Sequence, residues 1–276
     1  MASQLLGCLN PEGTKFAPDE FSKFREAFLK SGQPSVDAFL ERRPEFLDVG
    51  KLAIAFCLMP FEKEENLYYP NPSRGGDWYE YLSVKLNSSF EEFGQNRLSI
   101  ITFNYDRSLE QYLLNSLINL HGKTRDECAE ALAQIPIVHV YGQLGERPCP
   151  QQGSQMYRPD QMEIPKHVET AAAGIKLYHE EAEEASIGAR ELPSRAKRIC
   201  FLGFSYNQFN VSRLKLGRSK LDLSTTIIGT TRGLKGMEID DAKGRLAEAL
   251  GGDINLSPEV GFADNLDILR EHMFLG

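Results

Sequence analysis

Four short apolar runs, rich in β-branched residues, constrain the fold of this chain more than any other feature. The runs are LSIITFN at 98–104, IPIVHVYG at 135–142, RICFLGFS at 198–205 and STTIIGTT at 224–231. Each has the length of a β-strand, and helical patterns separate one run from the next. Strands that are apolar on both faces and alternate with helices form a parallel sheet with both faces covered. The sequence therefore predicts an α/β fold with a Rossmann-like, doubly wound and mainly parallel sheet.

Helical patterns occupy most of the remaining chain. Residues 17–30 place Phe21, Phe24 and Phe28 at helical spacing after an acidic first turn, and we expect residues 1–97 to be mostly helical. Further helices are predicted within 34–60 and over 78–86, 107–119, 124–133, 160–186, 207–216, 235–250 and 264–273, with a polar loop at 62–77. We expect one domain over 1–276, with residues 98–276 as its Rossmann-like core.

Charge and cysteine usage limit the classes of partner. The net charge of −8 over 276 residues argues against general binding to nucleic acid or anionic membrane, because both depend on surplus Lys and Arg. No apolar run reaches the ~18 to 20 residues that span a bilayer. The five cysteines form no C-x-x-C pair, so we expect neither a metal site nor a disulfide framework, and a reducing cytoplasm fits best.

Polar residues and glycines gather at the ends of the four predicted strands. The ends are Thr102–Asp106, His139–Gly142, Gly203–Asn207 and Gly229–Gly233. Ligands of doubly wound sheets bind beyond the carboxyl ends of the strands, and glycine lets the backbone approach a phosphate closely. One such end is common in α/β proteins, whereas four together predict a ligand site.

These ends resemble those of the bacterial sirtuin-like domains, many of which hydrolyse NAD. The resemblance extends over residues 35–275 and includes TFNYDRSLE, its most specific part, then HVYG, FLGFSYNQFN and IIGTTRGL with Glu238. It implies a Rossmann-like sheet that holds NAD across the strand ends, and a role in bacterial antiphage defence. A bound NAD or ADP-ribose derivative and an oligomeric or sensor partner are the partners that it implies.

The resemblance implies roles for individual residues. Asn104 is expected to contact the ribose next to nicotinamide and to position a water, with Asp106 supporting that site or the bound cofactor. The expected cofactor contacts are Thr102, Phe103, Gly142, Gly203, Ser205, Asn207, Gly229 and Thr230, with Asn210 as an alternative to Asn207. An amide suits an oxocarbenium-like transition state, because it binds ribose hydroxyls through both ends without titrating. The alternative makes Asn104 a turn residue and Asp106 a helix cap.

The base expected beside the ribose departs from the family pattern. Sirtuin relatives commonly place a His directly before the strand-end glycine, where this chain has Tyr141 before Gly142, with His139 two residues earlier. Tyrosine titrates near pH 10 and is a poor base at neutral pH, whereas histidine titrates near 6.5. In a continuous strand residues 139 and 141 face the same side. His139 is therefore predicted either to contribute to the site or to be a core histidine.

The chain also lacks the Gly-Ala-Gly-x-Ser type loop and the first strand with which family members open. The simplest interpretation is that this sequence starts late, so that the first strand of the sheet is missing. Without paired C-x-x-C motifs for the zinc module of sirtuin deacylases, protein deacylation ranks below NAD hydrolysis. A module that binds NAD or ADP-ribose without turnover, and a purely structural protein, remain alternatives.

Overall fold

The computed structural model describes residues 18–33, 35–68, 78–145, 165–177, 183–214, 221, 225–250, 254–255 and 265–271. The chain forms two compact units that interleave along the sequence. Unit 1 takes Met1–Pro70, Thr102–Tyr112 and Tyr141–Ala182, and unit 2 takes Asn71–Ile101, Leu113–Val140 and Glu183–Gly276. Unit 1 thus combines the helical N-terminal part with the segment that contains the TFNYD motif.

Unit 1 is mostly helical. Its elements are α2 (Pro18–Lys30), α3 (Val36–Leu40), η1 (Pro44–Phe46), α4 (Leu47–Leu58), η2 (Met59–Glu62), α5 (Glu64–Tyr68) and α9 (Pro165–Ala173). The predicted helix at 17–30 is confirmed as α2, and it buries Phe21, Phe24 and Phe28 along one face, as its periodicity requires. Helix α5 corrects the predicted loop at 62–77, because Leu67 is buried and gives this short polar segment an apolar anchor.

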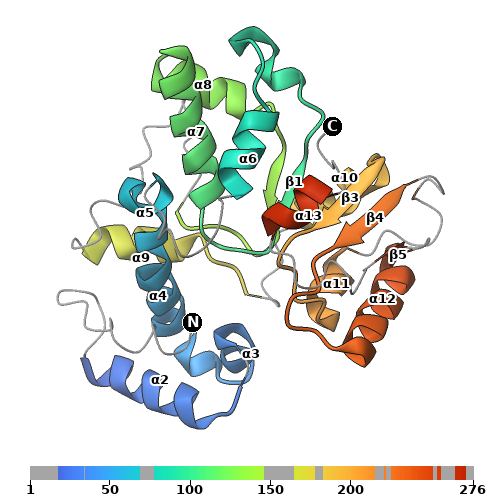
Figure 1. Cartoon of the computed structure of the whole chain (residues 1–276). Helices are drawn as coiled ribbons and strands as arrows, with labels where there is room; N and C mark the ends of the chain where they lie inside the picture. Colours follow the sequence, from blue (N-terminus) through green and yellow to red (C-terminus); the bar gives the residue numbers. More distant parts are fainter. Residues whose placement is uncertain are drawn as a thin grey trace. The chain divides into compact units, whose positions relative to one another are not determined.

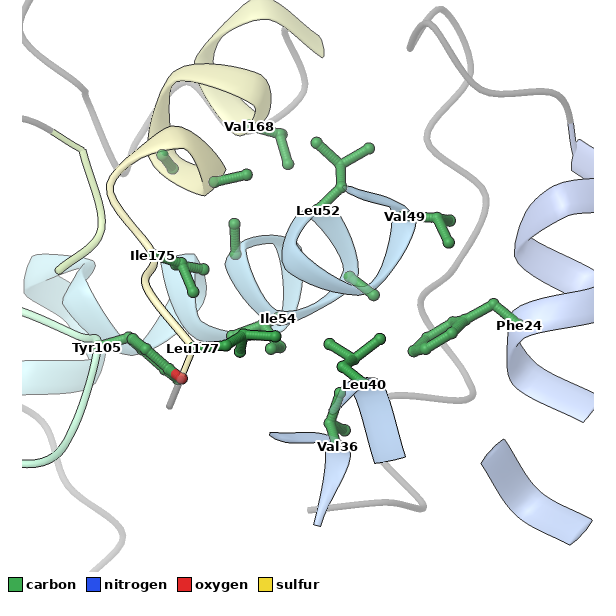
Figure 2. Close-up of a cluster of buried hydrophobic side chains, with 14 of the residues drawn as sticks. Phe24, Val36, Leu40, Val49, Leu52, Ile54, Tyr105, Val168, Ile175 and Leu177 are labelled. Carbon is green, nitrogen blue, oxygen red and sulfur yellow. The ribbon is translucent and has the colours of Figure 1, made fainter. Parts of the chain in front are cut away.

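The core of unit 1 forms where α4 packs against α9. Ala53 and Ala55 of α4 and Ala171 of α9 are completely buried, and side chains of this size let two helices approach closely. Figure 2 shows Leu52 of α4 on the side of the helix toward Val168 and Ile54 on the opposite side, near Leu177, with other buried apolar side chains of the unit around them.

The predicted helix over 160–186 is wrong as one continuous element. Helix α9 ends at Ala173, Ile175 then forms an antiparallel bridge with Gly142, and α10 (Glu183–Ser194) begins a separate helix. The N–H of Lys176 donates to the carbonyl of Tyr141 at 2.8 Å. This pairing replaces helical hydrogen bonds after Ala173 and explains the break. Val168 and Ala172 of α9, and Ile175 after it, are buried in the core of unit 1.

Unit 2 contains all or most of each strand. Its helical elements are α6 (Trp78–Lys85), η4 (Phe90–Gln95), α8 (Arg125–Leu132), α10, α11 (Gln208–Arg213), α12 (Gly236–Leu250) and α13 (Asn265–Glu271), and α7 (Ser108–His121) belongs partly to each unit. The strands are β1 (Ile100–Thr102), β2 (Ile137–His139), β3 (Arg198–Phe201), β4 (Thr226–Gly229) and β5 (Ile254–Asn255). Within the described residues, β1 and β2 form one sheet, and β3, β4 and β5 form another in that order.

The three-stranded sheet is parallel and is covered by helices. Phe201 of β3 pairs with Gly229 of β4, so the carboxyl ends of these neighbouring strands lie at the same edge. In Figure 1, α13 lies on one side of the β3–β4 pair and α11 and α12 on the other. Ile268 and Leu269 of α13 pack against Ile228 of β4. The predicted α/β class with parallel strands and covering helices is confirmed at this level.

Candidate functional site

The tip that follows β1 presents residue 104 to solvent. The N–H of Asn104 donates to Oγ1 of Thr102 at 3.1 Å, which turns the chain directly after the strand without glycine or proline. Asn104 is exposed, whereas Tyr105 beside it is buried. Oδ1 of Asp106 accepts the N–H of Ser108, the first residue of α7, at 3.3 Å. Asp106 therefore helps to start the helix, as the capping alternative predicted.

Tyr105 anchors the tip in the core of unit 1. Its hydroxyl donates to Oδ1 of Asp37 on α3 at 2.5 Å, and its carbonyl accepts the N–H of Leu144 at 2.7 Å. Figure 2 shows the Tyr105 ring pointing toward Leu177 at the edge of the buried cluster. A buried phenol bonded to a carboxylate restrains both neighbouring residues, so the positions of Asn104 and Asp106 depend on the N-terminal helices.

Residues 141 and 142 lie in the same unit as Asn104. The rings of Phe103 and Tyr141 meet edge to face, with centroids 5.7 Å apart. Gly142 has a φ of +74°, and a Cβ atom there would lie 2.2 Å from the carbonyl oxygen of Gly174. Chain packing thus accounts for a glycine at this position without any ligand.

His139 does not follow the predicted alternation with Tyr141. Strand β2 ends at His139 and residues 140 and 141 form a turn, so the rule that places 139 and 141 on one face does not apply. His139 is buried, with 5% of its surface exposed, and belongs to unit 2, whereas Tyr141 is half-buried and belongs to unit 1. Its burial favours the core-histidine alternative.

A second group of predicted residues meets at the carboxyl ends of β3 and β4. The N–H of Gly203, whose φ is +59°, donates to Oγ1 of Thr230 at 2.8 Å. The buried hydroxyl of Tyr206 donates to the carbonyl of Thr230 at 2.9 Å. Gly229, the last residue of β4, is buried. The predicted closeness of these two strand ends in unit 2 is therefore present.

The polar residues that follow β3 begin helix α11. Oδ1 of Asn207 accepts the N–H of Asn210 at 2.8 Å and caps the helix, as the capping alternative predicted. Oγ of Ser205 accepts hydrogen bonds from Nδ2 of Asn207 at 2.9 Å and of Asn210 at 3.1 Å. After β4, Arg232 is exposed and the carboxylate of Glu238 accepts the N–H of Lys235 at 2.8 Å. Ser205 and Asn207 are exposed and so stand at the surface of unit 2.

The structure adds one residue, Glu62, that sequence reasoning missed. Glu62 ends η2 with only 4% of its surface exposed, and its Oε1 accepts the N–H of Arg107 at 2.6 Å. Burial raises the pKa of Glu62 to about 7, against the opposing effects of the Arg107 N–H and charge, and the carboxylates of Asp106 and Glu110 add to the rise. One weak signal for it is present in the sequence: Glu62 directly follows the apolar run FCLMPF.

The described residues contain no group of three or more His, Cys, Asp or Glu side chains that would hold a metal ion. No described helix is long and apolar enough to cross a membrane. Comparison of the chain with protein-family models, curated proteins and solved structures finds no match. The functional interpretation therefore depends on the motifs at the strand ends and on the local geometry around them.

Proposed function

We propose that this chain is a sirtuin-like, NAD-binding α/β protein that hydrolyses NAD to nicotinamide and ADP-ribose. The observation that supports it best is the exposed Asn104, held at the end of β1 by a buried anchor at Tyr105. A Rossmann-like, doubly wound arrangement of the strands, a single domain and a cytoplasmic role in bacterial antiphage defence belong to the same proposal. Protein deacylation is a weaker alternative.

The proposed reaction needs orientation more than acid–base strength. Water adds to the anomeric carbon of the ribose, the bond to the nicotinamide nitrogen breaks, and the proton of the attacking water is released. Nicotinamide is a neutral leaving group. The amide of Asn104 would bind the ribose hydroxyls and align the water, while the carboxylate of Asp106 would stabilise positive charge on the sugar.

Within unit 2, the residues at the ends of β3 and β4 are proposed, from the resemblance, to bind the phosphate or adenosine part of NAD. The N–H of Gly203 and the hydroxyl of Thr230 already bond to each other, so we assign them the role of shaping the backbone. The exposed side chains of Ser205 and Asn207 are the proposed contacts to phosphate or adenosine ribose, beside the buried Gly229. Thr102, Phe103 and Gly142 are proposed to border the nicotinamide ribose.

The test is release of nicotinamide from NAD by the purified full chain, measured by chromatography. Asn104→Ala should reduce the rate by about 10²-fold or more, because orientation of the water and ribose is lost. Asn87→Ala, which truncates an exposed asparagine in unit 2, is the matched control and should retain the rate. Equal rates for wild type and Asn104→Ala would contradict the assignment of Asn104.

A binding module without turnover is the second candidate. It is favoured by the half-buried Tyr141, packed on Phe103 where relatives place a base, and by the burial of His139. Such a module predicts no nicotinamide release but ligand-dependent stabilisation, about 2.7 kcal/mol when ADP-ribose is present at 100 times its dissociation constant. A thermal shift without turnover would support this candidate over the hydrolase. Absence of both nicotinamide release and ligand-dependent stabilisation would instead favour a purely structural protein.

A further inference from the structure

The end of η2 holds the backbone at the start of α7 through two groups. Oε1 of Glu62 accepts the N–H of Arg107 at 2.6 Å, and the carbonyl of Phe61 accepts the hydroxyl of Ser108 at 3.4 Å. All four residues belong to unit 1. Since Asp106 and Arg107 are adjacent, the contact with Glu62 fixes the chain immediately after the proposed catalytic tip.

We propose that Glu62 is a positioning residue for this tip: by binding the N–H of Arg107 as a carboxylate, it sets the geometry in which Asn104 and Asp106 meet the ligand. This inference rests on the proposed NAD-dependent function. Glu62 touches no substrate in it and acts through the backbone. Glu62 as a whole is 4% exposed, so protein groups take the place of water around it.

The charges around Glu62 make the contact sensitive to protons. Arg107 favours the ionised form, Asp106 and Glu110 oppose it, and burial opposes it most, which raises its pKa to about 7. The other charged residues beside it, Lys63, Glu64 and Glu65, follow it directly in the chain, and the two glutamates are exposed. Near neutral pH both protonation states of Glu62 are therefore populated: a carboxylate, which accepts the N–H strongly, and a neutral acid, which accepts it weakly.

The side chain of Arg107 also indicates that Glu62 acts on the backbone of this residue. Nε of Arg107 is buried and donates no hydrogen bond in the part of the chain that the structure describes. Glu62 thus bonds to the backbone N–H of this residue rather than to Nε. A change of protonation at Glu62 acts first on the peptide between Asp106 and Arg107, which is the peptide that orients the tip.

The first measurement needs no ligand. With ¹⁵N-labelled arginine, and the Arg107 amide assigned through Arg107→Lys, the Arg107 resonance of wild type should shift with a midpoint near pH 7. In Glu62→Gln, which keeps an acceptor oxygen but cannot titrate, that shift should disappear. Glu65→Gln removes an exposed carboxyl three positions along the chain and should leave it intact. An Arg107 amide that does not titrate, or one that titrates equally in Glu62→Gln, overturns the proposal.

The second measurement is the pH profile of nicotinamide release. Between pH 6 and 8 ionisation of one group near pH 7 should raise the wild-type rate about tenfold, and Glu62→Gln should reduce that change to less than about twofold. Identical profiles overturn the role of Glu62. If wild type releases no nicotinamide while the Arg107 amide still titrates through Glu62, the proposed hydrolysis fails and the proton-dependent contact stands.

Discussion

Replacing Glu62 by glutamine should stabilise the protein at pH 8 and have no such effect near pH 4. In the unfolded chain the pKa of this glutamate is near 4.5, whereas in the folded protein the pKa of Glu62 is raised to about 7. The folded state therefore holds this proton more tightly than the unfolded state. The contribution of Glu62 to the free energy of unfolding is most favourable below about pH 4, falls as pH rises to 7, and is constant above.

The size of the effect follows from the two pKa values. A rise from 4.5 to about 7, at ~1.4 kcal/mol per pH unit, corresponds to about 3 kcal/mol at pH 8. Glutamine preserves the shape and the acceptor for the Arg107 N–H, and it removes the buried charge. The difference in unfolding free energy between variant and wild type should thus grow from near zero at pH 4 to about 3 kcal/mol at pH 8.

Urea unfolding followed by far-ultraviolet circular dichroism at a series of pH values measures this difference. Glu65→Gln serves as control, because its exposed carboxyl should leave the curve parallel to wild type. A difference between Glu62→Gln and wild type that does not vary with pH would refute the linkage argument. A wild type more stable than the variant at pH 8 would show that the ionised carboxylate gains more from Arg107 than burial costs.

Three substitutions, with Gly122→Ala as a control for the first, test other contacts by the change in urea midpoint. Gly142→Ala should destabilise by more than about 2 kcal/mol, because the residue is left-handed and its Cβ would meet a carbonyl oxygen at 2.2 Å; Gly122→Ala, left-handed with no atom within 4 Å of its Cβ, should cost only about 1 to 2 kcal/mol. Tyr105→Phe removes the hydroxyl bonded to the α3 carboxylate and should cost about 1.5 to 3 kcal/mol. Thr230→Val removes the acceptor of the Gly203 N–H and should cost about 1 kcal/mol.

Periodicity predicted the elements that bury a regular apolar face and failed where a distant contact sets the structure. Helix α2 agrees with its prediction to within a residue, since its phenylalanines pack inward at every turn. The break after Ala173 was not predictable, because it depends on the close approach of Gly174 to the carbonyl of Gln143, 2.2 Å from where a Cβ would stand. Strand β5 has only two residues, too few to show an apolar alternation from which a strand could be predicted.

The part of the candidate site that lies at strand ends and helix starts was predictable from the sequence. The sequence placed Asn104 at a strand tip and Asp106 at a helix start, and both expectations agree with the structure. It did not indicate Glu62, because a glutamate in a polar segment is ordinarily solvated. Its hydrogen-bond partner, Arg107, lies 45 positions later, and a contact over that distance leaves little local trace beyond the preceding apolar run. The functional assignment itself stays a prediction.

The glycines at the strand ends support NAD binding less than their number suggests. Gly142 is needed for its left-handed backbone and for the Gly174 carbonyl, and Gly203 is needed for a φ of +59° that lets its N–H reach Thr230. Folding alone therefore selects glycine at both positions. Residue 104 is different, because its bond to Thr102 uses a backbone N–H that every residue except proline supplies. The choice of an asparagine there is not explained by that bond, so substitution of Asn104 discriminates between a binding site and a mere turn far better than substitution of either glycine.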